Sequence, residues 1–207
     1  PVSTEESLAQ ESPVELHKLD NGLRVLIKRV PHLPLVNMQA YSMGSTLVEA
    51  DDQSGLASLT AAMLDQGVKG KSADEIAEYF DSIGGQFAIS AGRNSVFGSI
   101  TTLADDFTKA SALFSECLTR PTFPDEQFKK MKQLQLAGIA QRGANPQQEI
   151  FEVFSDNLPK TTPYHLVQGG KTGTVEKLTV ADVTADHAKW FVPQNMVVTV
   201  YGKIEPK

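Results

Sequence analysis

Strand-like and helix-like segments alternate in blocks along this chain, and this order is the feature that most restricts its fold. Six segments read as strands from their apolar patterning and flanking turn residues, at 15–19, 23–30, 35–44, 86–91, 95–102 and 196–202. Most follow one another in pairs rather than alternating singly with helices. The sequence therefore predicts an α+β fold with a largely antiparallel sheet of about six strands and helices packed on it.

Local signals set the boundaries of several elements. Asn21-Gly22 predicts a tight hairpin turn with positive φ angles between the first two strands. Ser72 and Glu75 form a capping-box pattern, Asn145-Pro146 is typical of a helix start, and Thr179 is suited to capping a further helix. Helices are expected at 55–67, 72–84, 105–119, from after Pro124 to about 142, 145–158 and 179–191, with a Gly- and Thr-rich loop at 159–174.

Composition excludes several classes of protein. The 207 residues are 41% hydrophobic and 21% charged, which is ample for a core. A net charge of −6 and a pI of about 5.2 do not favour nucleic acid as a partner. No window is apolar enough for a membrane span, and the single Cys117 excludes an intrachain disulfide. We expect a soluble protein, cytoplasmic or periplasmic, whose compartment the sequence leaves unassigned.

The domain organisation follows from where the structural patterns begin. Residues 1–14 are polar and acidic and lack the pattern of a signal peptide, so they are expected to be a linker or a cut end. No internal linker divides the remainder, and residues 15–207 are predicted to form one domain. Both termini suggest a fragment of a longer chain.

The segment "GLASLTAAMLDQG" at 55–67 predicts a short amphipathic helix with one depleted face. At about 100° per residue, Leu56, Leu59, Thr60 and Met63 share the side that a core would take. The opposite side carries the small or polar residues Ser58, Ala61, Ala62 and Asp65. From composition alone, the two alanines favour close packing against a neighbouring helix.

Several motifs together resemble the pitrilysin or insulinase-like (M16) metallopeptidases, which include the mitochondrial processing peptidases. They are found in order along nearly the whole chain, and six in register make chance agreement improbable. The motifs are "LDNGLRVLIK", "GS" at 44–45 with Glu49, "GLAxxxxxML" at 55–64, "KSADEIAEYFDSIGGQF" at 71–87, "RPTFPDEQF" at 120–128 and "FVPQNMVVTVYGKIEP" at 191–206. The resemblance implies the LuxS-like metallohydrolase fold for residues 15–207.

The resemblance also implies that a zinc site has been lost. Active members read G-L-A-H-x-x-E-H-M-L, with two histidines that bind Zn²⁺ and a glutamate that serves as the general base. The matching positions here are Ser58, Ala61 and Ala62. The family's third ligand is a later glutamate, which the register places near Met131, and no Asp or Glu occurs between Glu126 and Glu149. Neither catalytic residues nor a metal or cofactor site are therefore expected in this domain.

The function implied is that of a non-catalytic domain in a zinc peptidase. Such domains form the chamber wall and contact the peptide substrate, while a partner half or subunit with the H-x-x-E-H motif holds zinc. The isolated domain is not expected to be an enzyme. Two alternatives stay open. One is a structural interaction module without a role in proteolysis, like the respiratory-complex core proteins of this ancestry. The other is an independent enzyme using other residues, for which no Ser/His/Asp or Cys/His set is recognisable.

Three other features of the sequence favour ordinary roles. The spacings of His17, His32, His165 and His187 match no zinc pattern, so these side chains are expected to be exposed or hydrogen-bonded. Lys129, Lys130, Lys132 and Arg142 form a basic run without nearby acids, typical of a solvated helix face, with an acidic surface or partner domain as the alternative. The segment "QGGKTG" at 168–173 lacks the spacing of a phosphate-binding loop.

Overall fold

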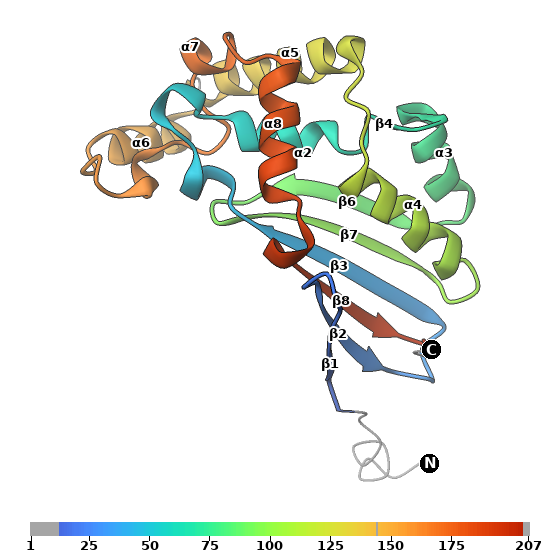
Figure 1. The fold of residues 1–207 in the computed structure, drawn as a ribbon. Helices are drawn as coiled ribbons and strands as arrows, with labels where there is room; N and C mark the ends of the chain where they lie inside the picture. The colour runs from blue at the N-terminus through green and yellow to red at the C-terminus, as the bar shows by residue number, and fades with distance from the viewer. Residues whose placement is uncertain (1–12, 144, 205–207) are drawn as a thin grey trace.

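The computed structural model describes residues 13–143 and 145–204, and its centre is a six-stranded sheet (Figure 1). The strands are β1 Glu15–Lys18, β2 Arg24–Arg29, β3 Leu35–Met43, β6 Gln86–Ala91, β7 Ser95–Leu103 and β8 Met196–Gly202. Their order across the sheet is β1-β2-β8-β3-β7-β6. Every pairing is antiparallel except the parallel β2–β8 pair. The predicted α+β class with a largely antiparallel sheet is confirmed.

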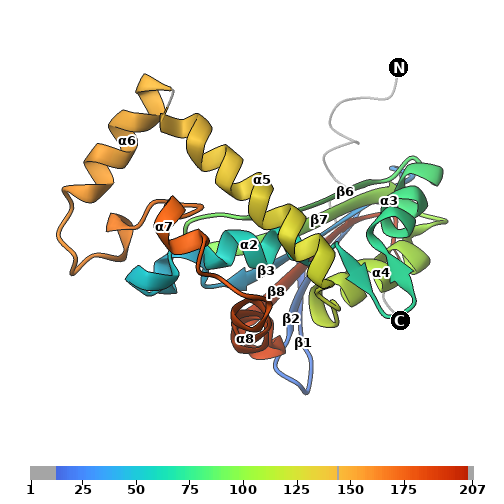
Figure 2. The same ribbon diagram turned by 90° about the horizontal axis from the view of Figure 1, so that it is seen from above.

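The helices gather over one face of this sheet (Figures 1 and 2). They are α2 Leu56–Met63, α3 Ala73–Ser82, α4 Phe107–Thr119, α5 Asp125–Gly143, α6 Pro146–Asp156, α7 Thr172–Val175 and α8 Val180–Trp190, with the 3₁₀ turns η1 Ser45–Val48, η2 Asp51–Gln53, η3 Pro163–His165 and η4 Pro193–Asn195. Strand burial alternates accordingly. On β7, Val96 and Ile100 are buried under the helices, whereas Phe97 and Leu103 are exposed on the other face. None of the helices in the described residues is long and apolar enough to cross a bilayer.

The capping signals act as the sequence predicts. The Ser72 hydroxyl accepts from the Glu75 backbone N–H, and the Glu75 carboxylate accepts from the Ser72 N–H at 2.8 Å. Thr179 caps α8 in the same reciprocal way with Asp182. At α6 the Asn145 side chain accepts from the Gln147 N–H at 3.0 Å. Predicted and observed ends of these helices agree within about two residues.

Two local predictions need correction, and one small element was not predicted. The Asn21-Gly22 connection is not a two-residue turn, because Lys18 pairs with Arg24 and only Gly22 has a positive φ, at 89°. The Asn21 side chain instead accepts from the Leu23 N–H at 3.1 Å. The predicted loop at 159–174 contains η3 and begins α7. A small antiparallel pair, β4 Gly67–Val68 with β5 Lys71–Ser72, was not predicted because two-residue strands leave no periodic pattern.

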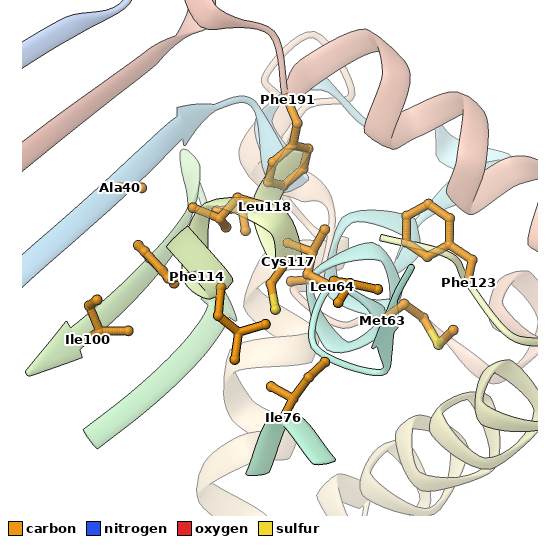
Figure 3. Packing of buried hydrophobic residues seen from close by; sticks show 14 of the residues in the cluster. Ala40, Met63, Leu64, Ile76, Ile100, Phe114, Cys117, Leu118, Phe123 and Phe191 are labelled. Carbon is orange, nitrogen blue, oxygen red and sulfur yellow. The ribbon is translucent and has the colours of Figure 1, made fainter. Parts of the chain in front are cut away.

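The hydrophobic core lies between α2, α4 and the sheet (Figure 3). Phe114 and Cys117 of α4 are fully buried, as are Met63 of α2 and Ile100 of β7. A Cβ on Gly98 would come within 2.9 Å of the Phe114 ring, so this strand position must stay small for α4 to pack. Within this core, α2 contacts the sheet at β6 and is flanked by α5 and α8.

Candidate functional site

Helix α2 carries Ser58, Ala61 and Ala62, the three positions that the family resemblance matches to a zinc motif, and it begins at an unusual cap. Its N-cap residue is Gly55, which has φ of 99° and no side chain to bond the free N–H groups of the first turn. The Glu49 carboxylate does so instead, accepting from the N–H of Gly55 at 3.2 Å and of Ala57 at 2.7 Å. A negative charge at this end also opposes the helix dipole. Glu49 therefore fixes where the helix starts.

The three motif positions do not share one open face. Ser58 and Ala62, one turn apart, are half-buried. Ala61, expected on the same depleted face, is only 2% exposed and belongs to the core cluster. The sequence interpretation assumed one covered side of α2, whereas the sheet, α5 and α8 together enclose most of its circumference. The alanine at 61 is thus also a packing residue.

Helix α5 lies beside α2 and bears the position expected for the third ligand. Met131 is partly buried against the core and lines a cavity with Asp65 and Gln66, beyond the C-terminal end of α2. The α5 side chain that bonds to the other end of α2 is Gln135, which sequence reasoning missed. Its amide donates at 2.9 Å to the carbonyls of both Gly55 and Gly169. The α5 groups at the two ends of α2 are therefore a thioether and an amide.

The donor set does not fit zinc. One hydroxyl, two methyl groups and a thioether stand where two imidazoles, a general base and a carboxylate would be needed. Among residues 13–143 and 145–204, no three His, Cys, Asp or Glu side chains are grouped so that they could hold a metal ion. The arrangement around α2 offers hydrogen bonds and packing rather than Lewis-acid chemistry.

Three carboxylates near α2 have pKa values raised mainly by burial: Asp65 just after its C-terminal end, and Glu49 and Asp186 around its N-terminal half. Burial raises the pKa of Glu49 to about 6, with the negative charge of Asp186 as a smaller contribution, while the bonds from Ala57 and Gly55 oppose the shift. Burial likewise raises the pKa of Asp186 on α8, which accepts a 2.7 Å bond from the Thr60 hydroxyl. Both line a small cavity together with Lys189. Their local bonds hold α2 to η1 and α8, which is a structural role.

The four histidines are in separate places. His17 on β1 lies 3.2 Å from Glu15, and His32 is exposed between β2 and β3. His165 contacts the Asp51 carboxylate at 2.8 Å and the Thr162 carbonyl at 2.6 Å, and these acceptors raise its pKa. His187 donates through Nε2 to the Leu118 carbonyl at 2.9 Å and stacks on Phe191, and burial lowers its pKa. The contacts of His17, His165 and His187 are thus local structural ones.

Two residues of the basic run on α5, Lys132 and Arg142, hold the 168–178 segment in place, whereas Lys129 and Lys130 are exposed as the sequence predicts. Lys132 donates to the carbonyls of Glu176 at 2.6 Å and Leu178 at 2.9 Å. Arg142 donates at 2.6 Å to the carbonyls of Gln168 and Gly170. It also lies 3.2 Å from the Glu152 carboxylate, so the expectation of a run without acidic partners is wrong at Arg142.

The glycines of "QGGKTG" permit close packing against α2. Gly170 has φ of 75°, and a Cβ there would overlap the Ser54 carbonyl. The Gln135 amide donates to the carbonyls of both Gly169 and Gly55 and so joins the two segments. Just before this segment, Tyr164 donates to the Asn94 side chain in the β6–β7 turn at 3.3 Å. The segment thus covers the start of α2.

Comparisons with known proteins agree with this architecture. The model of the insulinase family, peptidase family M16, matches residues 42–166. An uncharacterized zinc protease of Rickettsia bellii is 26% identical over 188 residues, which cover 91% of this chain and 46% of that protein. Subunit 1 of the bovine mitochondrial cytochrome b-c1 complex is 20% identical over 97% of this chain and 42% of that protein.

A solved structure shows the same similarity in three dimensions. The crystal structure of a peptidase M16 inactive domain from Pseudomonas fluorescens superposes with a TM-score of 0.89 and 28% sequence identity. The alignment covers 94% of this chain and 47% of that one. The chain therefore spans less than half the length of each of these relatives.

Proposed function

This chain belongs to the insulinase-like peptidase family M16, and on that basis we propose that it is a non-catalytic domain working beside a zinc-bearing half of the same family. In this role residues 15–207 form one domain of a longer assembly. The domain supplies chamber wall and substrate contacts, while zinc is held by an H-x-x-E-H motif in the partner half or subunit.

The observation that carries the proposal is the replacement of every metal-site group at once. Ser58, Ala61 and Ala62 leave α2 without a ligand pair or base, and α5 has no carboxylate after Glu126, with Met131 and Gln135 along the part that lies beside α2. The fold around these positions is nevertheless closely packed, with Ala61 in the core. A fold that is kept although its metal-ligand positions hold other side chains is expected where the domain contributes its shape to the assembly and not a catalytic group. The inactive-domain description of the Pseudomonas fluorescens relative supports this interpretation.

The sheet offers a place for an extended peptide. Strand β6 is an outer strand of the six-stranded sheet, so one side of its backbone pairs with no strand among residues 13–143 and 145–204. Helix α2, which carries Ser58, Ala61 and Ala62, packs over β6. A peptide can add to such an edge through backbone hydrogen bonds, with alternate side chains facing the domain. We assign substrate contact to the β6 edge on this ground.

A second candidate function is a structural interaction module without a role in proteolysis. The similarity to subunit 1 of the cytochrome b-c1 complex favours it, because that protein belongs to a respiratory complex. Both functions predict no metal in this domain. They differ in whether the domain increases the activity of a zinc-bearing partner.

Mixing the two halves tests the proposal. The purified chain is combined with an H-x-x-E-H-bearing family member from the same genome, and cleavage of a fluorogenic peptide library is measured for each component and for the mixture. We expect hydrolysis only when the zinc-bearing half is present, and a clear gain on mixing. Absence of a gain, with the two chains bound to each other, favours the structural module. Hydrolysis by the isolated chain contradicts both and supports an independent enzyme.

A further inference from the structure

Helix α6 is amphipathic with its apolar side facing outwards. Ile150, Phe151, Val153 and Phe154 are 67%, 69%, 57% and 61% exposed. We call these four side chains the α6 apolar face. A surface helix of a globular protein normally turns such residues towards the core. Figures 1 and 2 show α6 standing away from the sheet, next to the end of α5.

The polar side of α6 is the one held by the rest of the domain. Glu152 pairs with Arg142 of α5 at 3.2 Å, with both side chains less than one-third exposed. Ser155, one turn later, is 2% exposed. Asp156 pairs with Lys171 at 2.6 Å, just before α7. These contacts at one side of the helix fix its rotation, so the apolar face cannot turn inwards without breaking them.

We propose that the α6 apolar face docks into an apolar groove, flanked by basic side chains, on the zinc-bearing half of the assembly. The inference rests on the proposed function, since it names the surface by which this domain meets that half. Docking of an amphipathic helix in a groove uses anchors at i, i+3 and i+4, which is the spacing of Ile150, Val153 and Phe154. Phe151 lies next to Ile150 and widens the same face.

The size of the face fits one part of a stable interface. Four large side chains exposed to this degree present on the order of 500 Å² of apolar surface, near the upper end for the largest patch on a monomer. A standard protein interface buries about 800 Å² on each partner. The α6 apolar face is thus large enough to form the apolar centre of an interface while needing a polar rim around it. The relatives are about twice as long as this chain, so they contain further residues that could form a domain covering the α6 apolar face.

Charge decides between possible occupants. Glu149 directly precedes the apolar face on α6 and forms no ion pair with any residue in the described part of the chain, whereas Glu152 and Asp156 are paired within the domain. The whole chain carries −6. A second copy would bring a like-charged face to this one, and an anionic membrane would repel it. A groove with a basic rim satisfies Glu149 and leaves the two internal ion pairs intact.

Binding of the full chain to the zinc-bearing half, measured by isothermal titration calorimetry, tests the inference. We expect Phe151→Glu with Phe154→Glu to weaken binding on the order of 100-fold, as for anchor residues at the centre of an interface. Leu16→Glu, at a side chain of β1 that is 66% exposed, is the matched control and is expected to bind like the unmodified chain. Circular dichroism and thermal unfolding establish that both variants are folded.

The outcomes separate this inference from the proposed function. If the double variant binds and activates like the unmodified chain, the α6 inference is wrong and the proposed function stands. If the unmodified chain neither binds nor activates the zinc-bearing half, both fail. Loss of self-association in sedimentation, or of binding to phosphatidylglycerol vesicles, on Phe151→Glu would instead identify a second copy or a membrane as the occupant. Glu149→Lys is expected to slow association several-fold at low salt, and an unchanged rate would exclude a basic rim.

Discussion

The hydroxyl of Thr60 on α2 donates a 2.7 Å hydrogen bond to Oδ2 of Asp186 on α8. Thr60 is completely buried. It belongs to the same helix as Ser58, Ala61 and Ala62 and lies on the side of that helix that faces the core. The two residues are 126 positions apart, so this bond joins early and late parts of the chain. It fixes the position of α2 relative to α8, and with it the place of Ser58 and Ala62.

Replacement of Thr60 tests this link. Thr60→Val keeps the shape but removes the donor, which leaves a buried carboxylate without this partner. We expect the free energy of unfolding to fall by about 1–3 kcal/mol. Thr60→Ser retains the hydroxyl and serves as the control. Urea denaturation at pH 7 measures both, and equal stability of the two variants would mean that the bond contributes nothing.

The Glu49 cap predicts a pH-dependent stability. Its folded pKa of about 6 lies above the ordinary 4.5, so the folded state holds this proton more tightly than the unfolded state. Between these two values the unfolded chain loses its proton first, and stability falls as pH rises. Glu49→Gln removes this dependence. We expect its unfolding free energy, relative to the unmodified chain, to rise by about 1–2 kcal/mol from pH 4.5 to pH 7.

Glu75 provides the opposite sign as a control. The bonds from Ser72 lower its pKa, so its contribution is present above the ordinary pKa and is lost as pH falls. Glu75→Gln should therefore become less stable, relative to the unmodified chain, as pH rises. Denaturation midpoints at several pH values check both variants. A common direction in the two would show that the buried environment of Glu49 is not the cause.

Rebuilding the metal motif on α2 is expected to fail. Ala61→Glu places a carboxylate where only 2% of the residue is exposed, and should lower the unfolding free energy by about 3 kcal/mol. Ser58→His with Ala62→His adds two imidazoles at half-buried positions but no third ligand. We expect the triple variant to retain less than one equivalent of zinc after dialysis, and to have no peptidase activity. A full equivalent by metal analysis, together with turnover, would show that α5 supplies a ligand after all.

Gly170, beside the start of α2, and Gly84, just after α3, permit a matched comparison. Gly170 and Gly84 both have positive φ, at 75° and 60°, so alanine is strained at either position. A Cβ at Gly84 meets nothing within 4 Å, whereas at Gly170 it would overlap the Ser54 carbonyl. We expect Gly170→Ala to lose about 1–3 kcal/mol more than Gly84→Ala. Similar thermal unfolding of the two would mean that the 168–170 segment can move away from α2.

Local chemistry made most of the fold predictable. The strand boundaries at Gln86–Ala91 and Met196–Gly202 match the sequence prediction, because apolar runs end at clear turn residues there. The capping boxes at Ser72 and Thr179 are equally local. The order of strands was not predicted, since the pairing of β8 with β2 and β3 depends on contacts between distant segments.

The candidate site was predictable only in part. The side chains of Ser58 and Ala62 follow directly from the sequence, and their match to zinc-ligand positions comes from the family motif. The burial of Ala61 was missed because periodicity describes one helix and not what encloses it. The Glu49 cap and the Gln135 amide were missed for a related reason. Each reaches α2 from another segment, where the usual capping pattern has no counterpart.

The place of β8 in the sheet has a consequence for biosynthesis. Residues 196–202 pair with β2 on one side and β3 on the other, between two strands that leave the ribosome much earlier. Until they emerge, β2 and β3 have a gap between them and the nascent sheet shows two open inner edges. The sheet can be completed only after β8 has been synthesised. Before that point the open edges expose the nascent chain to aggregation and to binding by chaperones. A chain truncated before residue 196 is expected to aggregate for the same reason.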